Sequence, residues 1–278
     1  MFIARVDFGK VKKGQEDPEE LYDLGYGYLC DLLKNGQVYR GFLLGWTKGK
    51  LTGRVAIPRP NSFLTKFNCG YARETMKQLK KVFGQSPQWH LESDPPFNRF
   101  ASWRSASFLY LSTSALDDGP PVCHGDNGSE IPAYLLPLTD LEKERVYFWA
   151  GEYHHLDNVW LSSGSLELPA YKEMADVKSE LSKEGREICS IIESKAGAPT
   201  YYYLTRYWGR AKGEESRVCP GCGGKWTHLK GGLEEGPFHI FSFTCKPCRL
   251  VSHIGTSIES PARARIGEFH TPKHKTKK

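Results

Sequence analysis

Apolar and polar positions alternate at the start of the chain and predict a strand over residues 2–8. A helix over 18–34 is expected next, because an aspartate and a proline stand at its start and apolar side chains recur along one face. Two short apolar runs, 37–46 and 51–57, flank a Lys-Gly-Lys turn and predict a hairpin.

The pattern continues with a second helix over 63–82, which ends in two lysines and a glycine. Residues 87–100 contain adjacent prolines, so we expect an irregular segment with His90 in a loop. A strand over 107–112 follows. The order strand, helix, strand, strand, helix, strand predicts an N-terminal mixed α/β-sheet domain and places the protein in the α+β class.

The second half gives one strong helix signal. Residues 169–196 begin with proline, carry a regular apolar stripe and stop at Gly197, which predicts a single long helix. Residues 133–138 have a strand-like pattern. The apolar residues of 141–166 follow neither the helical nor the strand periodicity. We therefore divide the chain into four parts. They are an α+β domain (1–115), a linking region with the long helix (116–198), a cysteine-rich module (199–260) and a basic disordered tail (261–278).

The composition is that of a folded protein without a membrane anchor. Of the 278 residues, 39% are hydrophobic and 13% aromatic, which is enough for a buried core. No apolar stretch approaches the ~18 residues of a transmembrane helix, and the N-terminus lacks the features of a secretory signal. We expect a cytoplasmic protein with no membrane partner.

Positive charge is concentrated at the C-terminal end. Residues 206–278 contain 14 Lys or Arg and 6 Asp or Glu, whereas the rest of the chain contains 24 and 26. The net charge of +8 in this part indicates either binding to a polyanionic partner such as nucleic acid or an aid to solubility.

Four of the eight cysteines form two Cys-x-x-Cys turns: Cys219, Cys222, Cys245 and Cys248. Such turns point two thiolates at one ion, and two turns supply the four ligands of a tetrahedral Zn²⁺ site. The sequence therefore predicts a Cys₄ zinc ribbon holding one structural ion. A module this small depends on its metal for much of its folding free energy. We expect His228, His239 and His253 to be surface or packing residues.

The residues around the ribbon are rich in basic and aromatic side chains. Four basic residues are the candidate phosphate contacts: Lys225, Lys230, Lys246 and Arg249. Trp208 and Trp226 either stack nucleobases or pack the ribbon against the rest of the chain, and we favour packing.

Enzyme signatures are missing from the sequence. It has no phosphate-binding loop, no His-Glu-x-x-His pair and no nucleophile elbow. His90 and Glu92 match half of a zinc deaminase motif, but the Pro-Cys-x-x-Cys half is absent. We therefore expect no enzymatic activity, and a site in the N-terminal domain is the least favoured of three hypotheses.

Three motifs in order resemble a bacterial family described as zinc-ribbon-containing and possibly nucleic-acid-binding. They are PTYYYLTRYWG (199–209), CPGCGGKW (219–226) and FHIFSFTCKPCRLVSHI (238–254). The resemblance is densest over 180–255 and implies a metal-binding ribbon at the end of a larger α+β body. It also implies a second Cys-x-x-Cys in the middle of the chain, where this sequence keeps only Cys123.

The departure at Cys123 leaves two alternatives. The second metal site has been lost, which we favour, or it has been rebuilt from carboxylate and imidazole groups. The residues available for rebuilding are Cys123, His124, Asp126, His154 and His155.

Two functional hypotheses follow from these features. The first is a zinc protein whose ribbon presents a basic surface to nucleic acid. The alternative is a protein-interaction module, of immunity or adaptor type, in which the ribbon is purely structural and the partner is a protein.

Overall fold

The computed structural model describes residues 1–11, 17–39, 41–93, 101–117, 119–162, 164–226, 240–258 and 260–271. They form two compact units. The first unit comprises residues 1–102, 116–122 and 129–148, and the second comprises 103–115, 123–128 and 149–278. Both combine helices with a sheet, which confirms the α+β class. Our four-part division of the sequence stays a prediction.

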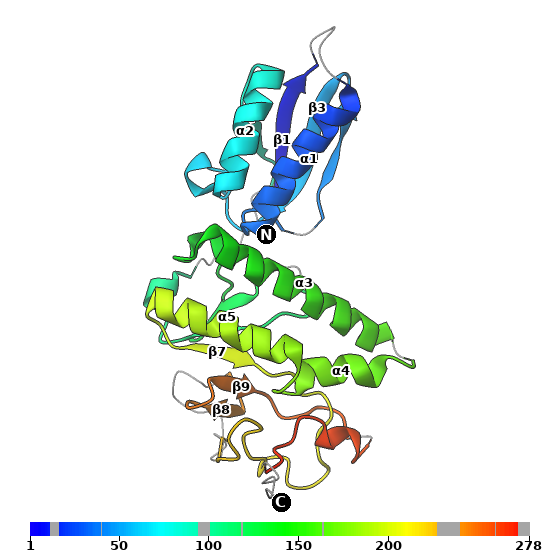
Figure 1. The fold of residues 1–278 in the computed structure, drawn as a ribbon, viewed down its shortest axis with the longest axis vertical. Helices are drawn as coiled ribbons and strands as arrows, with labels where there is room; N and C mark the ends of the chain where they lie inside the picture. Colours follow the sequence, from blue (N-terminus) through cyan, green and yellow to red (C-terminus); the bar gives the residue numbers. More distant parts are fainter. Residues whose placement is uncertain are drawn as a thin grey trace, which may run out of the picture. The chain divides into compact units, whose positions relative to one another are not determined.

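The first unit contains an antiparallel sheet with strand order β2-β3-β1-β4. Its strands are β1 (Phe2–Lys10), β2 (Leu43–Thr47), β3 (Lys50–Ile57) and β4 (Gln88–Leu91). Helices α1 (Pro18–Lys34) and α2 (Gly70–Phe83) lie on one face of this sheet (Figure 1). This βαββαβ chain order with the first and third strands in the centre is the split βαβ arrangement.

Local chemistry fixes the helix starts in this unit. The Asp17 carboxylate accepts a hydrogen bond from the backbone N–H of Glu19 at the start of α1. Helix α2 begins later than the expected 63–82, because residues 65–67 form a short 3₁₀ turn, η1 (Thr65–Phe67), and Cys69 caps the helix. Alternate residues of β1, including Ala4 and Val6, are fully buried under the helices.

The expectation for residues 87–100 was wrong in part. Residues 88–91 form β4, which pairs with β1 and places His90 in a strand rather than a loop. The sixth element of the N-terminal pattern is therefore β4. Strand β5 (Leu109–Leu111), which we assigned to this domain, belongs to the second sheet. Single-strand signals do not say which sheet a strand joins, because pairing partners are remote in sequence.

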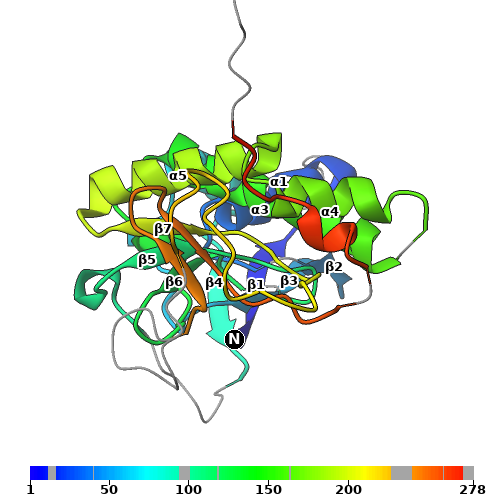
Figure 2. The same ribbon diagram turned by 90° about the horizontal axis from the view of Figure 1, so that it is seen from below.

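The second sheet has the order β6-β5-β7-β9-β8. Its other strands are β6 (Val122–His124), β7 (Thr200–Tyr203), β8 (Phe243–Cys245) and β9 (Leu250–Ser252). Strand β7 runs parallel to β5 and β9, and β8 is antiparallel to β9. Helix α5 (Glu180–Ala196) lies over β7 and β5 on one face of this sheet (Figure 2).

The predicted long helix over 169–196 is two helices, α4 (Glu167–Ala175) and α5. Asp176 leaves the helical conformation, and the Ser179 hydroxyl accepts the Ser182 N–H at 3.1 Å to start α5. A serine cap in mid-pattern thus interrupts a continuous apolar stripe. The ambiguous segment 141–166 is mainly α3 (Asp140–Ser162).

Residues 133–138 do not form the expected strand. They begin with a 3₁₀ turn, η3 (Ala133–Leu135), and two further 3₁₀ turns are η2 (Trp103–Ser105) and η4 (Arg263–Arg265). Within the described ranges, none of the helices is both long enough and apolar enough to cross a membrane.

Helix α5 packs on β7 through a glycine. A Cβ atom at Gly185 would lie 2.3 Å from the Tyr202 ring, whereas a Cβ at Gly27 in α1 would meet nothing within 4 Å. Gly185→Ala should therefore destabilise the protein by about 1–3 kcal/mol despite alanine's better helix propensity. Gly27→Ala is the matched control and should stabilise by about 0.5–1 kcal/mol. Denaturant unfolding checks both, and equal effects would contradict the close packing.

Candidate metal centre

The four cysteines of the two turns come together at one point of the second unit. One sulfur from each of Cys219, Cys222, Cys245 and Cys248 lies within 4.8 Å of all the others. The Sγ atoms of Cys222 and Cys245 are 3.7 Å apart. A tetrahedral Zn²⁺ with Zn–S bonds of about 2.3 Å separates its ligands by about 3.8 Å, so the observed spacing fits such an ion. None of the eight cysteines forms a disulfide.

Backbone hydrogen bonds shape the first turn. The Cys219 N–H donates to the Gly224 carbonyl, and the Gly223 N–H donates to the Cys219 carbonyl, both at 2.8 Å. Gly223 has φ +74°, a conformation that glycine adopts without strain. Close approach also restricts Gly221, because a Cβ there would lie 2.9 Å from the Cys248 sulfur. The glycines between the ligands let the two turns meet.

The second turn also has a positive φ at the residue after its second cysteine, but this residue is an arginine. Arg249 follows Cys248 as Gly223 follows Cys222, and it also has a positive φ, +51°. Its guanidinium is held by Glu193 of α5, with Nε–Oε2 and Nη2–Oε1 distances of 2.9 and 2.7 Å. This two-pronged ion pair stabilises the unusual backbone and joins the second turn to α5.

Electrostatics differ among the four thiols. Burial raises the pKa of Cys219 to about 12 and also raises the pKa of Cys248. The backbone N–H of Gly224 lowers the pKa of the exposed Cys222 thiol. A bound cation would hold the buried sulfurs as thiolates, because a metal compensates the charge that burial disfavours.

Aromatic packing supports the metal centre from within. Trp226 is buried and stacks on Phe243 of β8, with ring centroids 4.9 Å apart. The Thr244 N–H donates to the Trp226 carbonyl and so connects the exit of the first turn to β8. Trp208 is also buried, against Tyr171. The expectation that both tryptophans pack rather than stack bases is confirmed.

The segment predicted to begin the disordered tail is in part ordered. Residues 260–271 contain η4, and buried Arg217 donates to the Ala264 carbonyl at 2.5 Å. Phe269 lies against the first turn, since a Cβ at Gly223 would be 2.8 Å from its ring. These contacts order residues 260–271, and the boundaries of our four-part division stay predictions. Residues 272–278 lie outside the described part of the chain.

The candidate phosphate contacts separate into three groups. Lys225 and Lys246 are exposed beside the cysteines. Arg249 forms an ion pair with Glu193. Lys230 lies outside the described residues, as do His228 and His239. His253 is not among the clustered ligands, and its ring nitrogens lie 3.1 Å from the Tyr203 hydroxyl and 2.7 Å from the Ile240 carbonyl.

Of the residues considered for a rebuilt second site, His124 and Asp126 lie together, with Nδ1 and Oδ2 3.5 Å apart, but the described candidates do not form a group of three metal ligands. His154 Nε2 is 2.6 Å from the Thr113 hydroxyl, and Asp126 accepts the Ser107 N–H at 2.8 Å. His124 and Cys123 are buried in β6, and His155 is exposed. Loss of a second metal site stays a prediction.

Sequence reasoning missed the residues that fix the metal centre in place. Glu193 is 56 positions from Arg249 in the chain, and Phe269 was assigned to the tail. Neither carries a local signal, because an ion pair or ring contact between remote residues leaves no periodic pattern. The positive φ at Arg249 is likewise invisible in a residue type that rarely adopts it.

Two family models match successive parts of the chain after residue 102. A domain of unknown function, DUF2310, matches residues 103–205, and a second, DUF8594, matches residues 209–257 and so includes all four clustered cysteines. Neither description mentions a metal. No solved structure matches the chain.

Two relatives come from Haemophilus influenzae, strain Rd, and each is described as an uncharacterized protein. One is 32% identical over 206 residues, which span 72% of this chain and 76% of the relative. The other is 35% identical over 153 residues, or 54% of this chain and 72% of the relative.

Fold and site together define an α+β protein with a C-terminal group of four cysteines that has the geometry of a metal centre. The coverage and identity of the relatives show that the chain belongs to the bacterial family of these uncharacterized Haemophilus influenzae proteins.

The Arg249–Glu193 pair predicts a pH effect on stability. Burial alone would raise the pKa of Glu193, but hydrogen bonds and the charge of Arg249 bring it below its ordinary value. The stabilisation is therefore present above the unfolded pKa and is lost as pH falls through the lower, folded pKa. Glu193→Gln should cost about 0.5–1 kcal/mol at neutral pH.

Urea unfolding of the metal-loaded chain and of Glu193→Gln over a pH series measures this difference. The two curves should converge at acidic pH. A difference that grows as pH falls would contradict the role of Glu193.

Proposed function

We propose that the four cysteines bind one Zn²⁺ as a structural ion. The observation that carries this proposal is the mutual approach of four sulfurs within 4.8 Å, without disulfides. Thiolates favour soft or borderline cations, and four of them complete a tetrahedral shell with no position for a reacting water. The centre thus supports a structural rather than a catalytic role, and we propose no enzymatic activity for it.

The purified chain should contain one zinc ion, measured by elemental analysis. Cys222→Ser should weaken metal retention against a chelator and lower the unfolding midpoint. Cys30→Ser, at a cysteine outside the group, is the control and should retain the metal. Equal zinc content in both variants, or a different resident metal, would contradict the proposed centre.

We further propose that the C-terminal region binds nucleic acid through phosphate contacts made by its basic residues. Lys225 and Lys246 support this because Lys225 stands three positions after Cys222, Lys246 directly follows Cys245, and both side chains are exposed. Phe269 also contacts the first Cys-x-x-Cys turn, so the start of the C-terminal segment lies beside that turn. The sequence of residues 272–278 contains four more lysines. Metal binding would then hold the phosphate contacts together.

Affinity for a labelled oligonucleotide should fall steeply with added salt, because phosphate contacts release counterions. Lys225→Gln with Lys246→Gln should reduce the slope of log K against log salt by about 1.5. Lys172→Gln, an exposed lysine of α4, is the control and should leave the slope unchanged. Fluorescence anisotropy measures these slopes, and affinity that does not depend on salt would remove the proposal.

The alternative, a protein-interaction module with a structural ribbon, is favoured by two observations. Arg249 pairs with Glu193 of its own chain, although 41% of its side chain stays exposed. Apolar side chains are also exposed at the end of α3 and the start of α4: Val159, Leu161, Leu166 and Leu168, at 37–60%. Association with a protein that resists salt and requires these leucines separates this role from nucleic-acid binding.

A further inference from the structure

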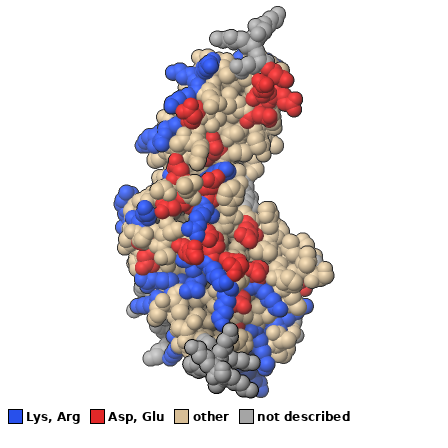
Figure 3. Space-filling view, in the orientation of Figure 1, with Lys and Arg blue, Asp and Glu red and all other residues tan. Residues whose placement is uncertain are grey.

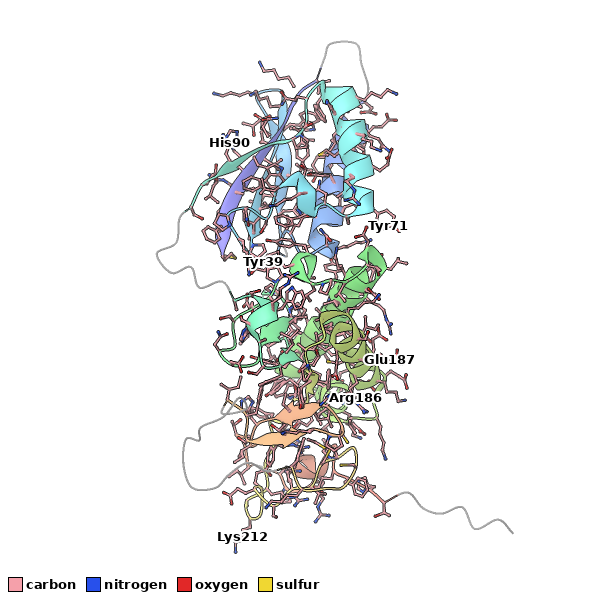
Figure 4. The ribbon with its side chains drawn as sticks, turned by 90° about the vertical axis from the view of Figure 1, so that its left-hand side faces the viewer. Tyr39, Tyr71, His90, Arg186, Glu187 and Lys212 are labelled. Carbon is pink, nitrogen blue, oxygen red and sulfur yellow. The ribbon has the colours of Figure 1, made fainter. Side chains whose placement is uncertain are left out.

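The register of the first sheet aligns three nitrogen-bearing side chains in one row. Arg54 of β3 lies directly opposite Arg5 of β1, and Arg5 lies directly opposite His90 of β4. Their neighbours Ala4 and Val6 are fully buried beneath the helices, so the row lies on the other face. Figure 4 shows His90 on the side of the sheet away from α2.

The same two central strands contain a second pair of like charges. Lys10 of β1 lies opposite Lys50 of β3, beyond an irregularity between Asp7 and Gly9. Like charges directly opposite one another destabilise a sheet. Two such pairs on one face are therefore a cost to folding that calls for an explanation.

Carboxylates on this face neutralise only part of the charge. Glu92 lies 2.8 Å from Arg54 and 3.8 Å from Arg5, and Asp7 lies 3.2 Å from Lys50. Among the described residues of this face, Arg5, Arg54 and Lys50 therefore pair with two carboxylates. The side chains of Arg5 and Arg54 are 48% and 66% exposed, which leaves their guanidinium groups open to a partner.

The Phe and Trp side chains of the four described strands lie on the helix side of the sheet. The four aromatic residues of these strands, Phe2, Phe8, Trp46 and Trp89, all pack into the core on the helix side. Within the described strands, the open face therefore offers charge, hydrogen bonds and the His90 ring, but no Phe, Tyr or Trp ring. It also lacks the apolar centre of a protein interface, since Leu43 is the one large, strongly exposed apolar residue at the outward positions of these described strands.

We propose that the open face of the first sheet binds the phosphate backbone of single-stranded nucleic acid without regard to base sequence. Guanidinium forks match phosphate oxygens, and three adjacent strands spread the row from Arg54 to His90 over about 10 Å. That width suits one extended backbone. This surface belongs to the first unit and the four cysteines belong to the second, so each proposal is tested by its own variants.

Loss of charge gives the first test, made on the full metal-loaded chain with labelled oligo(dT). Arg5→Gln with Arg54→Gln should reduce the slope of log K against log salt by about 1.5, because two phosphate contacts disappear. Arg5→Lys with Arg54→Lys should restore most of the slope. Lys81→Gln, an exposed lysine on the helix side of the same unit, is the matched control.

Gain of affinity gives the second test. Glu92→Gln removes the carboxylate shared by Arg5 and Arg54, so oligo(dT) should bind about threefold to fivefold more tightly at fixed low salt. A misfolded variant cannot produce tighter binding that keeps its salt dependence. Unchanged or weaker binding by this variant, with normal unfolding, overturns the proposal.

The outcomes separate this surface from the ribbon. If Arg5→Gln/Arg54→Gln leaves the slope unchanged while Lys225→Gln/Lys246→Gln lowers it, the open face is overturned and the ribbon proposal stands. The reverse result supports the open face alone. Tighter binding of a duplex or of polyglutamate through Arg5 and Arg54, or a strong preference between oligo(dT) and oligo(dA), overturns the stated partner.

Discussion

The convergence of four sulfurs is the constraint on which the C-terminal part of the chain depends. Strands β8 and β9 have three residues each, and two strands of that length do not stabilise themselves in water. A metal ion would join both Cys-x-x-Cys turns at their ends. The Tyr202 N–H donates to the Arg249 carbonyl, so the same turn that carries Cys248 also extends the sheet from β7.

Arg249 shows how the metal centre and the fold share one residue. Its backbone adopts a left-handed conformation so that the second turn closes, and its side chain pairs with Glu193 on α5. A glycine would close the turn without strain, as Gly223 does in the first turn, but it would not make the ion pair. The arginine therefore has a strained backbone, and its ion pair with Glu193 attaches the turn to α5.

Charge counted from sequence overstates the charge that a partner can meet. Of the basic residues after position 205, Arg206 and Arg217 are buried and Arg210 is paired with Glu268. Burial and the nearby Arg217 lower the pKa of Arg206 to about 10. Figure 3 likewise shows acidic and basic side chains interspersed over the face that carries α5. The excess of +8 in the last quarter is thus partly internal structure.

The parts of the fold that were predictable from sequence are those with local causes. A capped amphipathic stretch predicted α1, and the spacing of paired cysteines predicted the four-cysteine group, because each signal lies within a few residues. Strand pairing was not predictable, since β4 joins a strand some 85 positions away. The same limit hid the row of Arg54, Arg5 and His90, which exists only once three strands are in register.

That row also shows what the core of the first unit tolerates. Facing cations reduce stability by an amount on the order of 1 kcal/mol for each pair. The opposite face of β1 buries Phe2, Ala4, Val6 and Phe8 almost completely, which stabilises the same strand by several times that amount. The helix-covered face therefore determines the fold, and the open face is left free to carry charges that folding alone would not select.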